Sequence, residues 1–329
     1  MKITNQLKAA TQLAKVKFLS RRIPVAIRWQ LTNRCPSRCL YCNLWNQPSP
    51  DLTTKQIFNI IDQVKRAGTV RISYSGGEPM MREDLGKLID HTANKGISVS
   101  INSNGYQIPE KLDELKNLDL VKISLDGPRE VDNKVRGVPE AYDWAVDAAE
   151  ALFDAGRNFT FCTTITKYNC DTLGFMVDLA RKYNTMVAFQ PLKTIYRGVK
   201  DMNDIYPSPE EWERAMRTLR DLQRKFPENI RNSELLLDHI ENWPKYGKFT
   251  CYSGKAFCII DVDGSLVPCD RIDYPRGNVP NILEFGFGKA WSVLPEARCS
   301  GCGFCGANEL NYLLEGELEV FKSLTRLLK

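Results

Sequence analysis

Cysteines are the residues of this sequence best able to do chemistry, and they fall into three groups. The chain of 329 residues contains 11 of them. They are Cys35, Cys39 and Cys42, then Cys162 and Cys170, and finally Cys251, Cys258, Cys269, Cys299, Cys302 and Cys305. Because their number is odd and no signal-peptide pattern precedes them, we expect a cytoplasmic chain without disulfides. Clustered cysteines in a reduced chain indicate metal binding.

The first cysteine group directly follows a predicted strand at Val25–Thr32. Its sequence is Cys35-Pro-Ser-Arg-Cys39-Leu-Tyr-Cys42. Ligands of parallel α/β sheets bind at the carboxyl ends of strands, so this loop is well placed for a site. Three thiolates from one loop suit a four-iron cluster with one iron left open. A zinc site would need a fourth ligand, and a loop of simply packed cysteines is the remaining alternative.

The first group resembles the CxxxCxΦC motif of the radical S-adenosylmethionine (radical SAM) superfamily, with Tyr41 as its aromatic residue. Further motifs follow in the family's order. Ser75-Gly76-Gly77-Glu78-Pro79 is similar to the family's GGEP motif, and after it come Ser103-Asn104-Gly105, Ser124-Leu125-Asp126-Gly127 and Arg136-Gly137. The resemblance covers roughly residues 25–195.

This resemblance implies a 4Fe-4S cluster on the first three cysteines, with S-adenosylmethionine on the open iron. The Gly76–Pro79 backbone, with Glu78, would hold the methionine amine, and Arg136 would pair with the carboxylate. Tyr41 would lie near the adenine. The polar residues suited to the ribose hydroxyls, or else to ordinary hydrogen bonds at strand ends, are Ser103, Asn104, Ser124 and Asp126.

The implied reaction is reductive. One electron from an external donor, such as flavodoxin or ferredoxin, cleaves S-adenosylmethionine, and the 5′-deoxyadenosyl radical abstracts a hydrogen atom from the substrate. The cofactor carries the difficult step and the protein positions it. No acid–base residue of the chain stands out as catalytic.

The C-terminal cysteines from Cys251 to Cys269, with Gly264 between them, resemble the opening of the SPASM or twitch auxiliary-cluster domains. Six cysteines are too few to ligate two cubanes fully, so we expect one auxiliary 4Fe-4S cluster. Cys251 and Cys269 are the firmest ligands and Cys302 is the next. The fourth is Cys299, Cys305 or Cys258, although Cys258 also fits a core position. A four-thiolate zinc site is the alternative, and the isolated Cys162 and Cys170 are expected to be structural.

The elements that must position these groups alternate between strand and helix patterns. The expected strands are 25–32, 69–75, 97–101, 120–125, 159–165 and 187–191, and the expected helices are 53–67, 85–94, 110–117, 141–155 and 171–183. Six β/α units imply a parallel sheet curled into a partial (β/α)6 TIM-like barrel. We divide the chain into a basic amphipathic helix (1–24), the barrel (25–195), a bridge with a helix near Pro209–Phe226 (196–250), and a small β-hairpin and helix domain for the auxiliary cluster (251–329). That domain would hold a hairpin turning at Asp263-Gly264 and a helix at 310–328.

The leading functional hypothesis is oxidation or bond formation on a small molecule. Modification of a peptide side chain is one alternative, and a lipid or isoprenoid substrate is another, since the N-terminal helix could lie on a membrane surface instead of docking on the barrel. A zinc or iron–sulfur scaffold is the non-enzymatic alternative. A net charge of +5 gives no nucleic-acid signature, and no apolar run approaches about 18 residues. Candidate substrate contacts are Tyr74, Asn102, Thr164, Gln190, Lys193 and Arg197.

Overall fold

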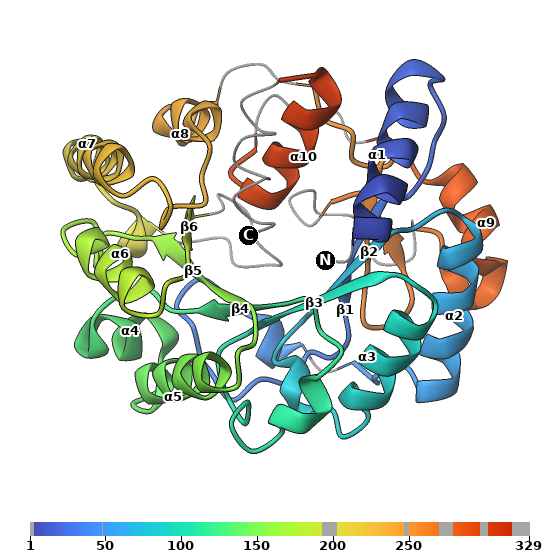
Figure 1. Cartoon of the computed structure of the whole chain (residues 1–329), viewed down its shortest axis with the longest axis horizontal. Coiled ribbons are helices and arrows are strands. Elements are labelled where there is room, and N and C mark those ends of the chain that lie inside the picture. Colours follow the sequence, from blue (N-terminus) through green and yellow to red (C-terminus); the bar gives the residue numbers. More distant parts are fainter. Residues whose placement is uncertain are drawn as a thin grey trace.

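The computed structural model describes residues 3–47, 49–192, 203–246, 250–269, 279–296 and 302–317. Within these ranges eight strands form one curved sheet, in the order β6-β5-β4-β3-β2-β1-β7-β8. The strands are β1 (Ala26–Gln30), β2 (Arg71–Ser75), β3 (Ser98–Ser103), β4 (Leu120–Ser124), β5 (Phe159–Ile165), β6 (Val187–Pro191), β7 (Phe257–Ile260) and β8 (Leu266–Val267). Neighbouring strands are parallel except the β7–β8 hairpin. Figure 1 shows this sheet as an incomplete barrel ringed by helices, which confirms the predicted fold class.

Successive residues of each strand point to opposite faces of the sheet. In β2, Ile72 and Tyr74 are fully buried in the core between sheet and helices, whereas Arg71 and Ser73 line the inside of the barrel. Most strand residues that face the inside are therefore polar, in contrast to the packed aliphatic interior of a closed eight-stranded barrel. This polarity leaves the barrel interior available to a ligand.

The helices that follow the strands cover the outer face of the sheet (Figure 1). They are α2 (Thr54–Arg66), α3 (Leu85–Asn94), α4 (Arg129–Arg136), α5 (Ala141–Asp154) and α6 (Leu173–Lys182), and the chain continues into α7 (Pro209–Lys225) and α8 (Glu234–Glu241). A capping box begins α2, since Thr53 and Gln56 each accept a hydrogen bond from the other's backbone amide. Its apolar residues, spaced three and four apart, face the core: Ile57, Ile60, Ile61 and Val64.

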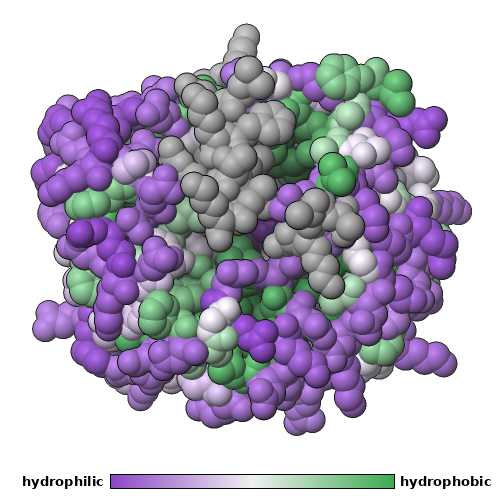
Figure 2. Space-filling view, viewed as in Figure 1, coloured by the Kyte–Doolittle hydropathy of each residue, from purple (hydrophilic) through white to green (hydrophobic). Residues whose placement is uncertain are grey.

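The two ends of the described chain pack together. Helix α1 (Ile3–Phe18) contacts α10 (Cys305–Glu315), with Val16 and Leu13 against Leu310 and Leu314. The N-terminal helix is thus docked on the main body, although Phe18 remains 77% exposed. Figure 2 shows hydrophobic surface at the upper right, where α1 ends in Figure 1. No helix among the described residues is long and apolar enough to cross a membrane.

Three features differ from the sequence predictions. The helix predicted at 110–117 is only a 3-10 turn, η3 (Leu112–Leu115), because this segment has few apolar residues and buries Leu115 alone among the four residues of the turn. The C-terminal helix begins earlier than predicted and ends where Gly316 adopts a left-handed conformation (φ 93°); residues 318–329 lie outside the described ranges. The helices α4, α8 and α9 (Ile282–Val293) were not predicted.

Candidate functional site

The first cysteine group lies in a loop, residues 35–42, directly after β1 at the carboxyl ends of the parallel strands. The thiols of Cys35, Cys39 and Cys42 are half-buried and line one cavity. Burial raises the pKa of Cys35 and of Cys39 to about 12, and the positive charge of Arg136 opposes the rise at Cys39. A thiol of this kind ionises only when a strong positive partner, such as a metal centre, stabilises the thiolate.

One side of the cysteine loop is held by the Gly-Gly-Glu-Pro turn, residues 76–79. The Gly77 amide donates to Thr32 O at 2.7 Å, and the Glu78 amide donates to Arg34 O at 2.7 Å. A Cβ on Gly77 would lie 2.1 Å from Arg34 O, and one on Gly76, whose φ is +132°, would lie 2.3 Å from Thr32 O. Both glycines are therefore required by the backbone that leads into the cysteine loop, a role beyond the predicted contact with S-adenosylmethionine.

The other side of the loop rests on the end of α4. The amides of Arg38 and Leu40 donate to the carbonyls of Arg136 and Val135, each at 2.9 Å. Gly137 follows in a left-handed conformation, and a Cβ there would lie 2.2 Å from Arg38 O. The predicted Arg-Gly pair thus forms the C-terminal cap of a helix that carries the cysteine loop.

Glu78 joins this turn to the end of β3. Its carboxylate accepts hydrogen bonds from Ser103 Oγ at 2.9 Å, the Asn104 amide at 2.8 Å and the Met80 amide at 3.0 Å. Burial raises its pKa to about 7, against the opposite effect of these three bonds. The Asn104 side chain in turn donates to Ser37 Oγ at 2.8 Å, inside the cysteine loop. The structure thus brings together the predicted residues Glu78, Ser103 and Asn104.

Asp126, at the end of β4, gathers a second group of predicted residues. Its carboxylate accepts from Tyr41 Oη and from Arg136 Nη2, each at 2.9 Å, and from the Thr164 amide at 2.8 Å. Asp126 is fully buried. Its carboxylate is bound by protein groups, whereas Ser103, Asn104 and Ser124 line the cavity. The ribose, adenine and carboxylate contacts of this set remain predictions.

Below the cysteine loop a cavity of about 1570 Å³ occupies the barrel interior, reaches the amino ends of the strands and continues along α1 and α10. Of the candidate substrate contacts, Asn102, Thr164 and Gln190 line it. Tyr74 does not: it points to the outer face, where its hydroxyl bonds Thr92, because it is one residue out of phase with the lumen positions. Lys193 and Arg197 lie outside the described residues.

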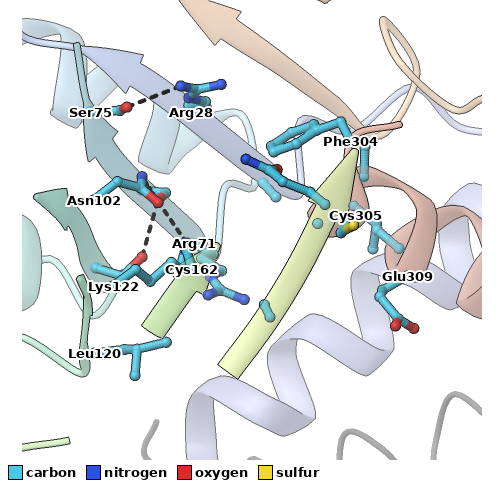
Figure 3. Close-up of a pocket in the computed structure, with 18 of the residues that line it drawn as sticks. Arg28, Arg71, Ser75, Asn102, Leu120, Lys122, Cys162, Phe304, Cys305 and Glu309 are labelled. Atoms are coloured by element: carbon cyan, nitrogen blue, oxygen red, sulfur yellow. Dashed lines mark hydrogen bonds between the residues drawn. The ribbon is translucent and has the colours of Figure 1, made fainter. Parts of the chain in front are cut away.

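Sequence reasoning missed four cations that also line this cavity, Arg28, Arg71, Lys122 and Arg231. A charged residue inside an otherwise apolar strand pattern is the signal that could have found the first three, since alternation places it on the face opposite the core. Figure 3 shows Arg28, Arg71 and Lys122 beside Cys162 and Cys305 in one part of the cavity.

The C-terminal cysteines lie in different surroundings. Ser253 Oγ donates to Pro268 O, which brings the segments that carry Cys251 and Cys269 together. Cys302, whose carbonyl accepts from Asn308, lies just before α10. Cys305 donates its thiol hydrogen to Phe189 O at 2.9 Å, and Cys258 is buried in the core on β7. Cys299 lies outside the described residues.

The two isolated cysteines differ as well. Cys170 is buried and donates to Thr166 O at 3.2 Å, whereas Cys162 lines the cavity. Among the residues described, no three Cys, His, Asp or Glu side chains meet as tightly as one metal ion requires. A four-iron cluster binds each ligand to a separate iron, so its cysteines stand further apart.

Comparisons with known proteins agree with these motifs. The model of the family described as "Radical SAM superfamily" matches residues 29–180. The mycofactocin maturase MftC of Mycolicibacterium smegmatis is 28% identical over 302 residues, 86% of this chain and 76% of that protein. The AdoMet-dependent heme synthase of Methanosarcina barkeri is 26% identical over 313 residues, 86% of this chain and 88% of that protein.

Among solved structures, native anSMEcpe with bound AdoMet and Cp18Cys peptide matches with a TM-score of 0.67 and 18% identity. The match covers 93% of this chain and 98% of that one. At this identity the likeness concerns the fold, and it spans both the barrel and the C-terminal region.

Proposed function

Because this chain is a radical SAM enzyme, we propose that its cysteine loop holds the 4Fe-4S cluster and S-adenosylmethionine at the mouth of the barrel, above a substrate peptide in the cavity. The observation that carries the proposal is the loop itself. Three half-buried thiols face the cavity, clamped between the Gly-Gly-Glu-Pro turn and α4. When bound, the cluster and S-adenosylmethionine supply the 5′-deoxyadenosyl radical that abstracts a hydrogen atom.

The chain's own residues fit this group. The open side of the loop is the cavity wall, and Asn104 and Arg136 stand beside Cys35 and Cys39. Arg136, which is already paired with Asp126, would bind the carboxylate of S-adenosylmethionine. We therefore assign Asp126 the task of fixing Arg136 and Tyr41 in place, and Glu78 the task of fixing the turn.

Two observations support a peptide as the substrate. One relative, 25% identical over 283 residues, is named as a PqqA peptide cyclase. A solved structure of similar fold has a bound peptide. A small molecule is the second candidate, because one relative is named as a heme synthase.

We further propose an auxiliary 4Fe-4S cluster on Cys251, Cys269 and Cys302. The contact between Ser253 and Pro268 brings the first two segments together, and the cavity wall includes Cys269. Cys258 also borders the cavity, but it is set aside as a ligand because it is held in the hydrophobic core on β7, opposite Ile27.

Production of 5′-deoxyadenosine tests the proposal. We expect the anaerobically reconstituted enzyme to form it from S-adenosylmethionine and dithionite, and the Cys35/Cys39/Cys42→Ala triple variant to form none. A synthetic copy of a short peptide encoded beside the gene should then change mass in step with 5′-deoxyadenosine. A loaded wild-type enzyme that forms no 5′-deoxyadenosine would contradict the proposal. Formation of 5′-deoxyadenosine with the peptide unchanged would favour the small molecule.

A further inference from the structure

The lower part of the cavity is lined by cations from separate elements. Arg28 comes from β1, Arg71 from β2, Lys122 from β4, and Arg231 follows the bridge that pairs Ile230 with β6. We call these four residues the lumen cations. In Figure 3 the labelled Arg71 and Lys122 project into the same space, with Cys162 beside them.

Among the described residues, three of the lumen cations, Arg71, Lys122 and Arg231, have few polar partners. Lys122 Nζ donates to Ser73 Oγ at 3.1 Å, and this acceptor is a neutral hydroxyl. Arg28, in contrast, donates from Nη2 to Ser75 Oγ at 3.1 Å and lies over the Phe304 ring. The guanidinium groups of Arg71 and Arg231 make no hydrogen bond or ion pair with any residue that the structure describes.

Three acidic residues nearby offset part of this charge, and Asp119 acts on Arg71, whose pKa it raises against the effect of burial. Asp119 uses one carboxylate oxygen on Ser98 Oγ and on the Val99 amide at the start of β3. Glu309, on α10, accepts from the Ser233 amide through one oxygen. Its other oxygen is buried without a hydrogen-bond partner, and its pKa is raised by burial. Glu228 also lies on the cavity wall.

The positive charges of the lumen cations lower one another's pKa values. Burial, followed by the charge of Arg231, lowers the pKa of Arg71 to about 10. Burial lowers the pKa of Lys122 as well, and the charges of Arg71 and Arg231 lower it further. Like charges held together out of water are unfavourable unless an anion joins them. Guanidinium groups match the oxygens of carboxylate and phosphate in pairs.

We infer that the lumen cations bind an anionic group of the substrate, a carboxylate or a phosphate, at Arg71, Lys122 and Arg231. This inference rests on the proposed function and deepens it. Arg71 is the first residue of β2, and Ser75, its last, lies at the level of the cysteine loop. Four residues of strand span about 13 Å. The substrate is therefore elongated, with its anionic end in the lumen and its reacting part below the cysteines.

Thermal unfolding of the cluster-loaded enzyme tests this site without turnover. The probes are inorganic phosphate and acetate, each compared with chloride at equal ionic strength. We expect the midpoint of unfolding, followed by circular dichroism under argon, to rise with one or both probes, because a ligand of the folded state stabilises it. A rise with phosphate alone identifies a phosphate group, and a rise with acetate identifies a carboxylate.

Variants of the lumen cations test whether the probes bind at these residues. Arg71→Gln and Arg231→Gln should weaken probe binding on the order of tenfold or more, because each loses charge-assisted hydrogen bonds. Arg71→Lys should keep most of the rise. The matched control is Arg224→Gln on α7, an exposed arginine whose partner is Asp221, and it should keep all of it. Iron content measured in parallel shows that each variant is folded and loaded.

Two results would overturn the inference. One is a wild-type midpoint that does not respond to either probe relative to chloride. The other is an equal response in wild type and in Arg71→Gln, which would mean a general salt effect. Either result in an enzyme that forms 5′-deoxyadenosine contradicts the anion site alone. Failure to form 5′-deoxyadenosine contradicts the proposed function. The unfolding measurement still tests the anion site, because it does not depend on turnover.

Discussion

Asp126 is a fully buried carboxylate with three protein donors, Tyr41, Arg136 and the Thr164 amide. Buried charges of this kind are stable only while they are paired. Its position between the aromatic residue of the cysteine loop and the arginine at the end of α4 makes it a support for the site. A substitution here therefore acts on cluster loading through the position of the loop.

We predict that Asp126→Asn lowers the free energy of unfolding by about 3 kcal/mol, the usual effect of removing one partner from a buried ion pair. The amide keeps the size of the side chain but leaves Arg136 with Asp132, 3.6 Å away, as its remaining acidic partner. Thermal unfolding measures the change. Asp143→Asn, which breaks an exposed pair with Arg129, is the control and should change little. Equal effects of the two substitutions would refute the argument.

Lys122 makes the free energy of unfolding depend on pH. Its pKa in the folded chain is lowered by burial and by Arg71 and Arg231. Between that value and its ordinary pKa of 10.5 the unfolded chain binds more protons, so the free energy of unfolding contributed by this group rises with pH. Lys122→Met removes this dependence.

We therefore expect Lys122→Met to raise the unfolding midpoint at pH 7. The difference from wild type should shrink as the pH approaches the ordinary lysine pKa of 10.5. Measurements at several pH values in chloride buffer, without phosphate or acetate, test this. Lys116→Met, at an exposed position after η3, is the matched control. A midpoint that Lys122→Met lowers at neutral pH would show that the lysine is well stabilised in the lumen.

At the scale of elements, the cysteine loop is held by two neighbouring elements whose backbones contact it directly at glycines. The Gly-Gly-Glu-Pro turn reaches Arg34 and the cap of α4 reaches Arg38, each through a glycine. The loop therefore has one position relative to the barrel before any cluster is bound. This is the preorganisation that a site for a reactive intermediate requires.

Gly77→Ala tests this clamp. Its new methyl group would lie 2.1 Å from Arg34 O, so the turn or the loop must move. We expect reconstituted protein to lose much of the iron held by the first cysteine group and to form little 5′-deoxyadenosine. Gly174→Ala, in α6 with open space around the glycine, is the control and should bind iron as wild type does. Full loading of Gly77→Ala would show that the clamp is dispensable.

The sequence predicted the elements whose patterns are local and missed those that depend on distant contacts. Six strands and the capping box of α2 were predictable from alternation and from Thr53 with Gln56. Helix α4 was not, because it is mostly charged, and the burial of Asp132, Val135 and Arg136 depends on contacts that include α5 and the cysteine loop. The motif residues of the site were found by resemblance, whereas the partners of Asp126 required the fold.

At the scale of the whole molecule, the C-terminal region continues the barrel. Strand β7 pairs in parallel with β1, with Cys258 opposite Ile27, so the hairpin is part of the same sheet. Helix α10 contacts both α1 and β6. The elements that carry the C-terminal cysteines therefore share one core with the radical site, and a change in one is expected to reach the other.

Iron content can show which C-terminal cysteines are ligands of the auxiliary cluster. Cys269 and Cys258 both border the cavity, but Cys269 is half-buried, whereas Cys258 is buried in the core, where burial raises the pKa of its thiol. We predict that reconstituted wild type holds about eight iron atoms per chain and that Cys269→Ala holds about four, the content of one cubane. Cys258→Ala, the matched control, should keep about eight while its unfolding midpoint falls, since a core thiol is lost without a cluster ligand. In Cys269→Ala the remaining cluster should still form 5′-deoxyadenosine, now uncoupled from product. Iron loss in Cys258→Ala equal to that in Cys269→Ala would instead make Cys258 a ligand and require β7 to rearrange when the cluster binds.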